Sequence, residues 1–198
     1  RKKYTEFKFV EVKMTDFNSL TASQLGDMIG QGKIDPVELT EHFLSQIELS
    51  PIGRKIYSTV TFKLALEQAK DSKKRADVGR RLSSLDGVPI SWKDLFDISG
   101  YPCEAGSELL AGRLAIKNAK VYNFAEAHGL ICLGKTHMSE LAFSGLGLNP
   151  SRETPPCVNY PESVPGGSSS GAATSVSFGL AAAGIGSDTG GSVRIPAA

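Results

Sequence analysis

The sequence contains little that would support a metal site, a disulfide framework or histidine chemistry. Its 198 residues include three histidines and three cysteines. The cysteines, Cys103, Cys132 and Cys157, are odd in number and show no C-x-x-C spacing. Disulfide frameworks and structural zinc sites need cysteines in pairs, so we expect neither of them. We expect a reducing, cytoplasmic location instead. We expect Cys132 in the core and the other two, each beside a proline, in loops.

Charge and hydropathy exclude two further kinds of protein. The 22 Lys and Arg residues and 21 Asp and Glu residues leave a formal net charge of +1, which gives no reason to expect nucleic-acid binding. No apolar run reaches the roughly 18–20 residues that cross a bilayer, and the opening RKKYTEFKFVEVK lacks the apolar centre of a secretory signal. We therefore expect neither a nucleic acid nor a membrane as a direct partner.

The segment 164–198, VPGGSSSGAATSVSFGLAAAGIGSDTGGSVRIPAA, is the most informative part of the chain. It holds two glycine–serine clusters, at 166–170 and 189–192. A flexible linker is disfavoured because core residues such as Phe178 and Leu180 are interleaved with the small ones. A nucleotide phosphate loop would need a lysine after the last glycine, and neither cluster has one. A serine after two glycines can instead lie on a turn whose N–H groups face the oxygen under attack, as acyl transfer requires.

A nucleophilic serine needs a base, and the histidines are poorly placed to supply one. His42 lies within a predicted helix, His128 lies at a predicted helix end, and His137 is at best near the site. A buried lysine is the alternative, because burial lowers the lysine pKa. Lys93 lies on an apolar-rich predicted strand at residues 87–95, where neighbouring side chains point to opposite faces, so that Asp94 need not hold it charged.

The residues alone leave the role of Lys93 open, because a surface lysine paired with Asp94 or Asp97 explains the same pattern. Three blocks in order then give a resemblance. These blocks resemble the amidase signature family of serine hydrolases. They are GVPISWKDLFDISG at 87–100, GKTHMSELAFSGLGLNP at 134–150, and GGSSSGA with GSDTGGSVRIPAA. Weaker similarity extends upstream to about Leu20. The pattern departs from the family at Ser170, where many members carry glycine.

The resemblance implies a catalytic triad in which Lys93 is the base, Ser168 bridges after a cis peptide bond, and Ser192 is the nucleophile. It also implies an acyl-enzyme intermediate, and no metal or organic cofactor. Ser169 and an ion pair between Asp188 and Arg194 would support the loop. Backbone N–H groups would form the oxyanion hole, and the residues that would supply them are Thr189, Gly190, Gly191 and Ser192.

Three functions are compatible with these features. The first is an amidase that hydrolyses a small-molecule carboxamide to an acid plus ammonia or an amine, with a homodimer left open for the full-length protein. The second is the amidase subunit of a glutamyl-tRNA(Gln) amidotransferase, which releases ammonia from glutamine for partner subunits. Such subunits usually show Lys-Asp-Asn and GGSSGG, where this chain has Lys93-Asp94-Leu95 and GGSSSG. The third is a truncated fragment without turnover.

Helical and strand patterns alternate, which predicts an α/β fold. Capping signals start helices at Thr21 and at Asp35-Pro36, the second running to about Leu49. The resemblance implies a large mixed β-sheet covered by helices on both faces, of which this chain would hold the N-terminal portion. We expect residues 1–198 to be a single partial domain, with 1–19 an N-terminal extension and a C-terminal continuation missing. Further predicted elements are strands at 56–62, 87–95 and 130–134, helices at 64–76 and 119–128, a short helix plus a strand within 172–183, a helix beginning near 197, and a long loop at 150–165.

Overall fold

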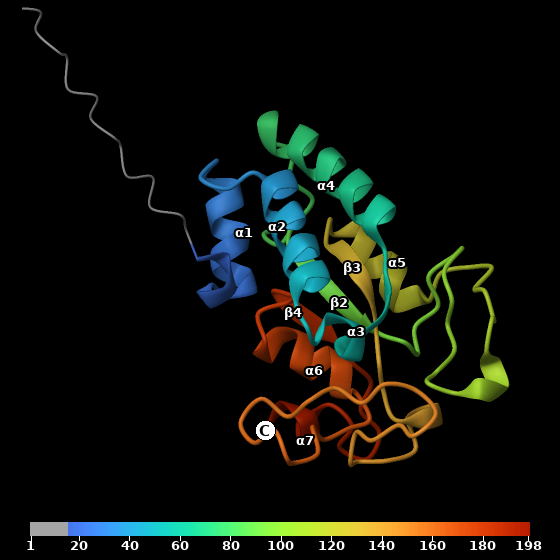
Figure 1. The fold of residues 1–198 in the computed structure, drawn as a ribbon. Helices are drawn as coiled ribbons and strands as arrows, with labels where there is room; N and C mark the ends of the chain where they lie inside the picture. The colour runs from blue at the N-terminus through green and yellow to red at the C-terminus, as the bar shows by residue number, and fades with distance from the viewer. Residues whose placement is uncertain (1–15) are drawn as a thin grey trace, which may run out of the picture.

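Four strands form a mixed sheet at the centre of the computed structural model, which describes residues 16–198 (Figure 1). The spatial order is β1-β3-β2-β4. Strand β2 runs parallel to both of its neighbours, and β1 runs antiparallel to β3. Parallel strands are buried on both faces, and every residue of β2 and β3 is buried. The bounds are β1 Tyr57–Val60, β2 Pro89–Lys93, β3 Ile131–Thr136 and β4 Ala183–Ile185.

Helices cover both faces of the sheet, and the alternation of β2 side chains shows which helix lies on which face. Ser91 contacts Ser175 of α6 (Ser170–Ser177), with 2.7 Å between the hydroxyl oxygens. Trp92 points to the opposite face, where its ring lies 5.2 Å from the ring of Tyr122 in α5 (Lys120–Ala127). Lys93 therefore shares the α6 face with Ser91.

The two N-terminal helices begin where local capping chemistry places them. Helix α1 (Ala22–Gly30) has a complete capping box, in which Thr21 and Gln24 satisfy each other's backbone N–H groups. Helix α2 (Pro36–Leu49) begins with Asp35 as N-cap and proline at the first position. Of the predicted N-terminal extension at 1–19, residues 1–15 lie outside the described part of the chain.

The remaining predicted elements are present with shifted ends. The predicted strand at 56–62 is shorter, because Ile56 ends the one-turn helix α3 (Gly53–Ile56) and Phe62 begins α4 (Phe62–Asp77). The helix predicted near 197 is α7 (Arg194–Ala197), which begins earlier. The predicted loop at 150–165 contains no helix or strand. Three 3-10 turns were not predicted: η1 Phe17–Ser19, η2 Glu108–Leu110 and η3 Glu140–Ala142.

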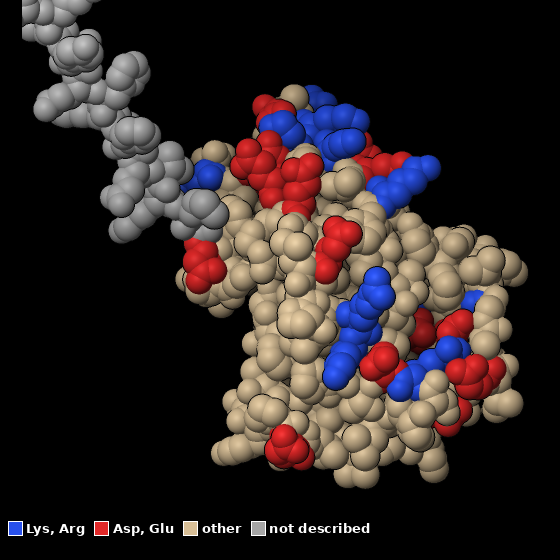
Figure 2. All heavy atoms as spheres, in the orientation of Figure 1, with Lys and Arg blue, Asp and Glu red and all other residues tan. Residues whose placement is uncertain are grey.

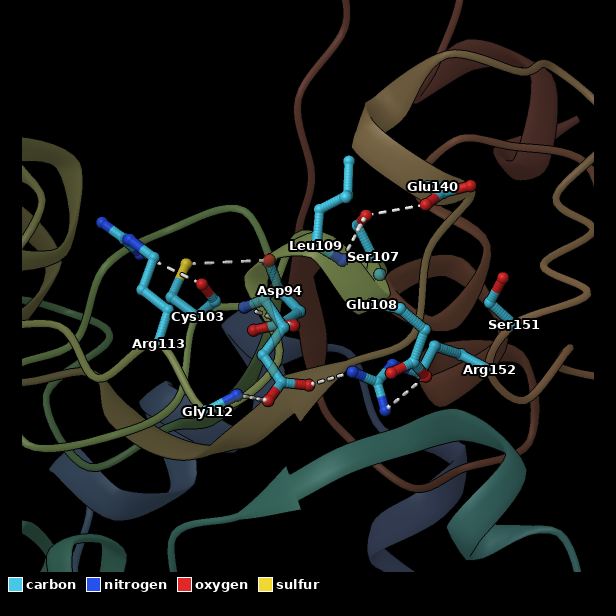
Figure 3. Close-up of polar contacts among 12 residues, drawn as sticks. Asp94, Cys103, Ser107, Glu108, Leu109, Gly112, Arg113, Glu140, Ser151 and Arg152 are labelled. Atoms are coloured by element: carbon cyan, nitrogen blue, oxygen red, sulfur yellow. Dashed lines mark hydrogen bonds and ion pairs between the residues drawn. The ribbon is translucent and has the colours of Figure 1, made fainter.

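The chain between β2 and α5 makes a long excursion that ion pairs hold to the body of the molecule (Figure 3). Arg152 binds it from the long loop, with contacts of 2.9 Å to Glu104 and 3.1 Å to Glu108. Arg113 forms a two-contact pair with Asp97 inside the excursion. The contacts of Arg152 join two segments that lie far apart in the sequence.

Charged side chains are unevenly distributed over the surface. On the face shown in Figure 2, acidic and basic groups gather over the end that carries α4, whereas the opposite end, near α7, carries few. Within residues 16–198, no helix combines the length and the apolar character needed to cross a bilayer.

Candidate active site

Lys93 is the last residue of β2, and its side chain is completely buried. Its Nζ lies 2.6 Å from Oγ of Ser168 and 2.8 Å from Oγ of Ser187. No carboxylate lies within ion-pair distance of this amine among residues 16–198. A buried amine whose neighbours are hydroxyl groups suits the neutral, proton-accepting form.

Burial lowers the pKa of Lys93 from 10.5 to about 8, and the negative charge of Asp188 opposes the shift. The adjacent carboxylate of Asp94 points away, as expected for neighbours on a strand, and pairs with Nζ of Lys135 at 2.7 Å. That second lysine is also fully buried, and it lies one strand away on β3. The two buried lysines thus differ in their partners: Lys135 has a carboxylate partner, and Lys93 has hydroxyl partners.

Ser168 is fixed by the glycine-rich segment that precedes α6. The Gly167–Ser168 peptide bond is cis, as the resemblance implies. The N–H of Ser139 donates to the carbonyl of Ser168 at 3.2 Å, and the N–H of Gly167 donates to Gly145 at 2.8 Å. A Cβ on Gly167 would meet backbone atoms of Gly147 at 2.6–2.7 Å. Glycine is therefore required here for close approach of the two chain segments.

Ser169 joins the two glycine–serine clusters. Its N–H donates to the carbonyl of Ser192 at 3.0 Å. Its hydroxyl bridges the backbone of Ser187, accepting from the N–H and donating to the carbonyl at 3.3 Å each. The backbone of Ser192 is thereby held beside the segment of Ser168, while its own hydroxyl makes no hydrogen bond within the described residues.

Asp188 clamps the loop that carries Ser192. Arg194 donates to its carboxylate through Nε and a terminal guanidinium nitrogen at 3.0 and 2.8 Å, which confirms the predicted ion pair. The backbone N–H groups of Gly191, Val193 and Arg194 also donate to it. Arg194 and these N–H groups hold the pKa of Asp188 far below its usual range.

This clamp engages one of the four expected oxyanion donors. The N–H of Gly191 donates to Asp188 at 2.8 Å, so in this structure it is not free to bind an oxyanion. The N–H groups of Thr189, Gly190 and Ser192 make no hydrogen bond within residues 16–198. An oxyanion hole on this loop would therefore use those three.

Two cavities flank this region, with volumes of about 260 and 460 Å³. Both are lined by the helices α6 and α7, and the smaller one reaches Ser169. Neither is lined by Lys93 or Ser192. The site is consequently described by its hydrogen bonds and its buried amine.

The other candidate side chains have structural surroundings. His137 is buried and burial lowers its pKa, whereas the imidazole of His42 bonds to Asn18 and that of His128 to a carbonyl of its own helix. Cys132 is buried in β3, as predicted, and Cys103 and Cys157 both lie in loops, as predicted, with Cys103 buried there. No group of three or more His, Cys, Asp and Glu side chains able to hold a metal occurs in residues 16–198.

Ser187 is the site residue that the sequence reasoning missed. It directly precedes Asp188, just before the second glycine–serine cluster, and its hydroxyl is the second partner of Lys93. Its position in the same GSDTGGS block was the available signal. The block pointed to Ser192 and to the loop N–H groups, but nothing in it indicated contact with a lysine 94 residues away.

Comparison with known proteins gives consistent matches. The family model described as Amidase matches residues 38–198. The A subunit of glutamyl-tRNA(Gln) amidotransferase from Acinetobacter baylyi is 38% identical over 185 residues, and the protein of the same name from Chloroflexus aurantiacus is 37% identical over 185. Each alignment covers 93% of this chain, but 37% and 38% of the relative. This chain therefore spans less than two fifths of the length of these relatives.

A solved structure shares the fold. The peptide amidase from Stenotrophomonas maltophilia superposes with a TM-score of 0.84 at 26% sequence identity. The superposition covers 92% of this chain and 39% of that one.

Proposed function

Because this chain belongs to the amidase family, we propose that it provides the catalytic residues of an enzyme that hydrolyses a carboxamide C–N bond. The observation that carries the proposal is the contact of 2.6 Å between the buried amine of Lys93 and the hydroxyl of Ser168. A neutral amine beside a hydroxyl forms a nucleophile-activating pair of the kind that histidine supplies elsewhere.

The proposed reaction begins with proton transfer along the three side chains. Ser192 Oγ attacks the carbonyl carbon while its proton passes to Ser168 and a proton of Ser168 passes to Lys93. The N–H groups of Thr189, Gly190 and Ser192 hold the oxyanion. The C–N bond then breaks, and the proton returns through Ser168 to the leaving nitrogen. Water attacks the acyl group by the same route, releasing the acid and restoring Ser192.

Labelling with a fluorophosphonate tests the nucleophile, because this probe reacts with an activated serine. We expect the full-length protein to be labelled at Ser192, and Ser192→Ala to lose more than about 99% of the labelling, in line with the loss of an essential nucleophile. Ser168→Ala should label far more slowly while it keeps the parent's far-UV circular dichroism. Ser163→Ala, an exposed serine in the long loop, is the matched control. Undiminished labelling of Ser192→Ala would overturn the triad.

A second function is favoured by the amidotransferase relatives at 37–38% identity. As the amidase subunit of a glutamyl-tRNA(Gln) amidotransferase, the protein would use the same three residues to release ammonia from glutamine for partner subunits. Leu95 and Ser170, which differ from the usual pattern of such subunits, argue for a free amidase. We therefore keep the free amidase as the leading proposal.

Substrate preference distinguishes the two. The full-length protein would be purified alone, and ammonia release from glutamine would be compared with release from aliphatic and aromatic carboxamides. A free amidase should hydrolyse the simple amides without any other protein. Turnover limited to glutamine, and dependent on copurifying subunits, would favour the amidotransferase.

We propose that residues 1–198 by themselves lack measurable turnover, since the matched relatives are more than twice as long.

A further inference from the structure

Ser187 lies against the proposed base but has no part in the reaction described above. Its Oγ is 2.8 Å from Nζ of Lys93, on a side chain that is half-buried. Its backbone is fixed from both directions by the hydroxyl of Ser169, at 3.3 Å to the N–H and 3.3 Å to the carbonyl. The hydroxyl of Ser187 is therefore presented to the lysine by a segment that is itself held in place.

The geometry of an amine explains what such a hydroxyl does. A neutral lysine amine has two N–H bonds and one lone pair, and it rotates about its terminal C–N bond. Proton transfer from Ser168 requires that the lone pair face Ser168. A free rotor would spend much of its time with an N–H bond in that direction. An acceptor on another side of the nitrogen removes this freedom by binding one N–H.

We propose that Ser187 is a positioning residue, whose Oγ accepts an N–H of Lys93 and thereby turns the lone pair of that amine toward Ser168. The inference rests on the proposed function, because it presupposes that Lys93 is the base. Ser187 would not touch the substrate. Its removal should slow the chemical step and leave binding unchanged.

The first test compares Ser187→Ala with the parent in the full-length protein, by the rate of fluorophosphonate labelling. We expect the maximal labelling rate to fall about 10- to 100-fold, as a misplaced catalytic group does. The probe concentration that gives half of this rate should change less than about twofold. The rising limb of the pH profile should also move to lower pH, because the ammonium form of Lys93 loses a hydrogen-bond acceptor. A purely structural role would not move this limb.

A pair of variants with nearly equal volume isolates the hydroxyl. Ser187→Thr keeps a hydroxyl on Cβ, and Ser187→Val replaces it with a methyl group. We expect Ser187→Thr to label at least about tenfold faster than Ser187→Val, by the same positioning effect. This comparison remains valid if Ser187→Ala folds poorly. Ser99→Ala, an exposed serine whose hydroxyl makes no hydrogen bond within the described residues, is the control.

The results separate the inference from the proposed function. If Ser187→Ala labels like the parent, or Ser187→Thr and Ser187→Val label equally, the positioning role is wrong. The same holds if the loss appears in probe binding and the maximal rate is unchanged. The proposed function fails by a different result, which is that Ser192→Ala still labels at the parent's rate.

Discussion

Lys93 connects burial to the pH dependence of the reaction. The proposed base must be neutral to accept a proton, and burial lowers the pKa of this lysine to about 8. The neutral fraction therefore increases through mildly alkaline pH, and we expect the labelling rate to rise with a midpoint near pH 8. A histidine base would give a rising limb near its ordinary pKa of ~6.5. A profile measured from pH 5 to 10 checks this, and a rate already constant from pH 6.5 would contradict it.

The same residue should cost folding stability at neutral pH. In the unfolded chain the lysine has its ordinary pKa of 10.5, so between about pH 8 and 10.5 the unfolded state binds more protons than the folded state. The free energy of unfolding contributed by Lys93 therefore rises with pH over this range and is lowest below pH 8.

Lys93→Met removes this cost together with the proposed base. At pH 7 we expect the variant to be more stable than the parent by about 1–3 kcal/mol, since each pKa unit corresponds to about 1.4 kcal/mol. The difference should shrink as the pH approaches 10.5. Urea unfolding of both proteins at pH 7 and pH 10 measures it, with labelling as the readout for lost activity. A gain that is equal at both pH values would show that ionisation is not the cause.

For single residues, the sequence predicted how neighbouring side chains diverge, and the resemblance implied that Lys93 meets Ser168, but other contacts made by folding were missed. The divergence of Lys93 and Asp94 follows from strand alternation and was predicted. The partners Lys135 and Ser187 were not predicted, because they come from other segments, 41 residues from Asp94 and 94 residues from Lys93. No local pattern encodes such contacts.

Among the elements, α6 lies unusually close to the chain leading out of β3, and Gly171 permits this approach. A Cβ at this position would lie 2.6 Å from the carbonyl oxygen of His137 and 2.8 Å from that of Ile56. Both are backbone atoms that cannot move aside independently. The displaced helix would carry Ser168 and Ser169 with it, because they directly precede it.

We expect Gly171→Ala to lower the free energy of unfolding by about 1–3 kcal/mol, as overpacking does. Helix propensity acts in the opposite direction, by about 1 kcal/mol, so the steric effect must exceed it. Thermal unfolding and labelling rate provide the measurement. Ser177→Ala, at an exposed position of the same helix, should change stability by less than about 0.5 kcal/mol. A stabilised Gly171→Ala variant would mean that α6 can shift at little cost.

Elements with local start and stop signals were predicted well. Asp35-Pro36 fixed the beginning of α2, and the alternation of β2 gave its faces. The one-turn helix α3 was missed because its stability comes from packing: a Cβ on Gly53 would meet the backbone of Ile47 in the preceding helix. The predicted strand around β1 was too long, because the residues before and after β1 belong to the helices α3 and α4.

For the whole molecule, exposed apolar side chains should govern behaviour in solution. Phe143, Ile116 and Leu109 are 94%, 91% and 84% exposed. Exposed apolar surface of this kind promotes association. We expect the 198-residue polypeptide to self-associate with increasing concentration, and Phe143→Ser to reduce this. Light scattering coupled to size-exclusion chromatography measures it, with Lys63→Ser as the exposed polar control. A monomer at every concentration would contradict the expectation.

The separation of the Lys93–Ser187 contact along the chain has a consequence for the order of events during synthesis. Ribosomes add about 5–20 residues per second, so Ser187 emerges roughly 5–20 s after Lys93. Until β4 and its following loop dock, the lysine lacks the hydroxyl partner that Ser187 supplies. We therefore expect the contact between Lys93 and Ser187 to be absent from the nascent chain until β4, the fourth strand of the described sheet, has docked.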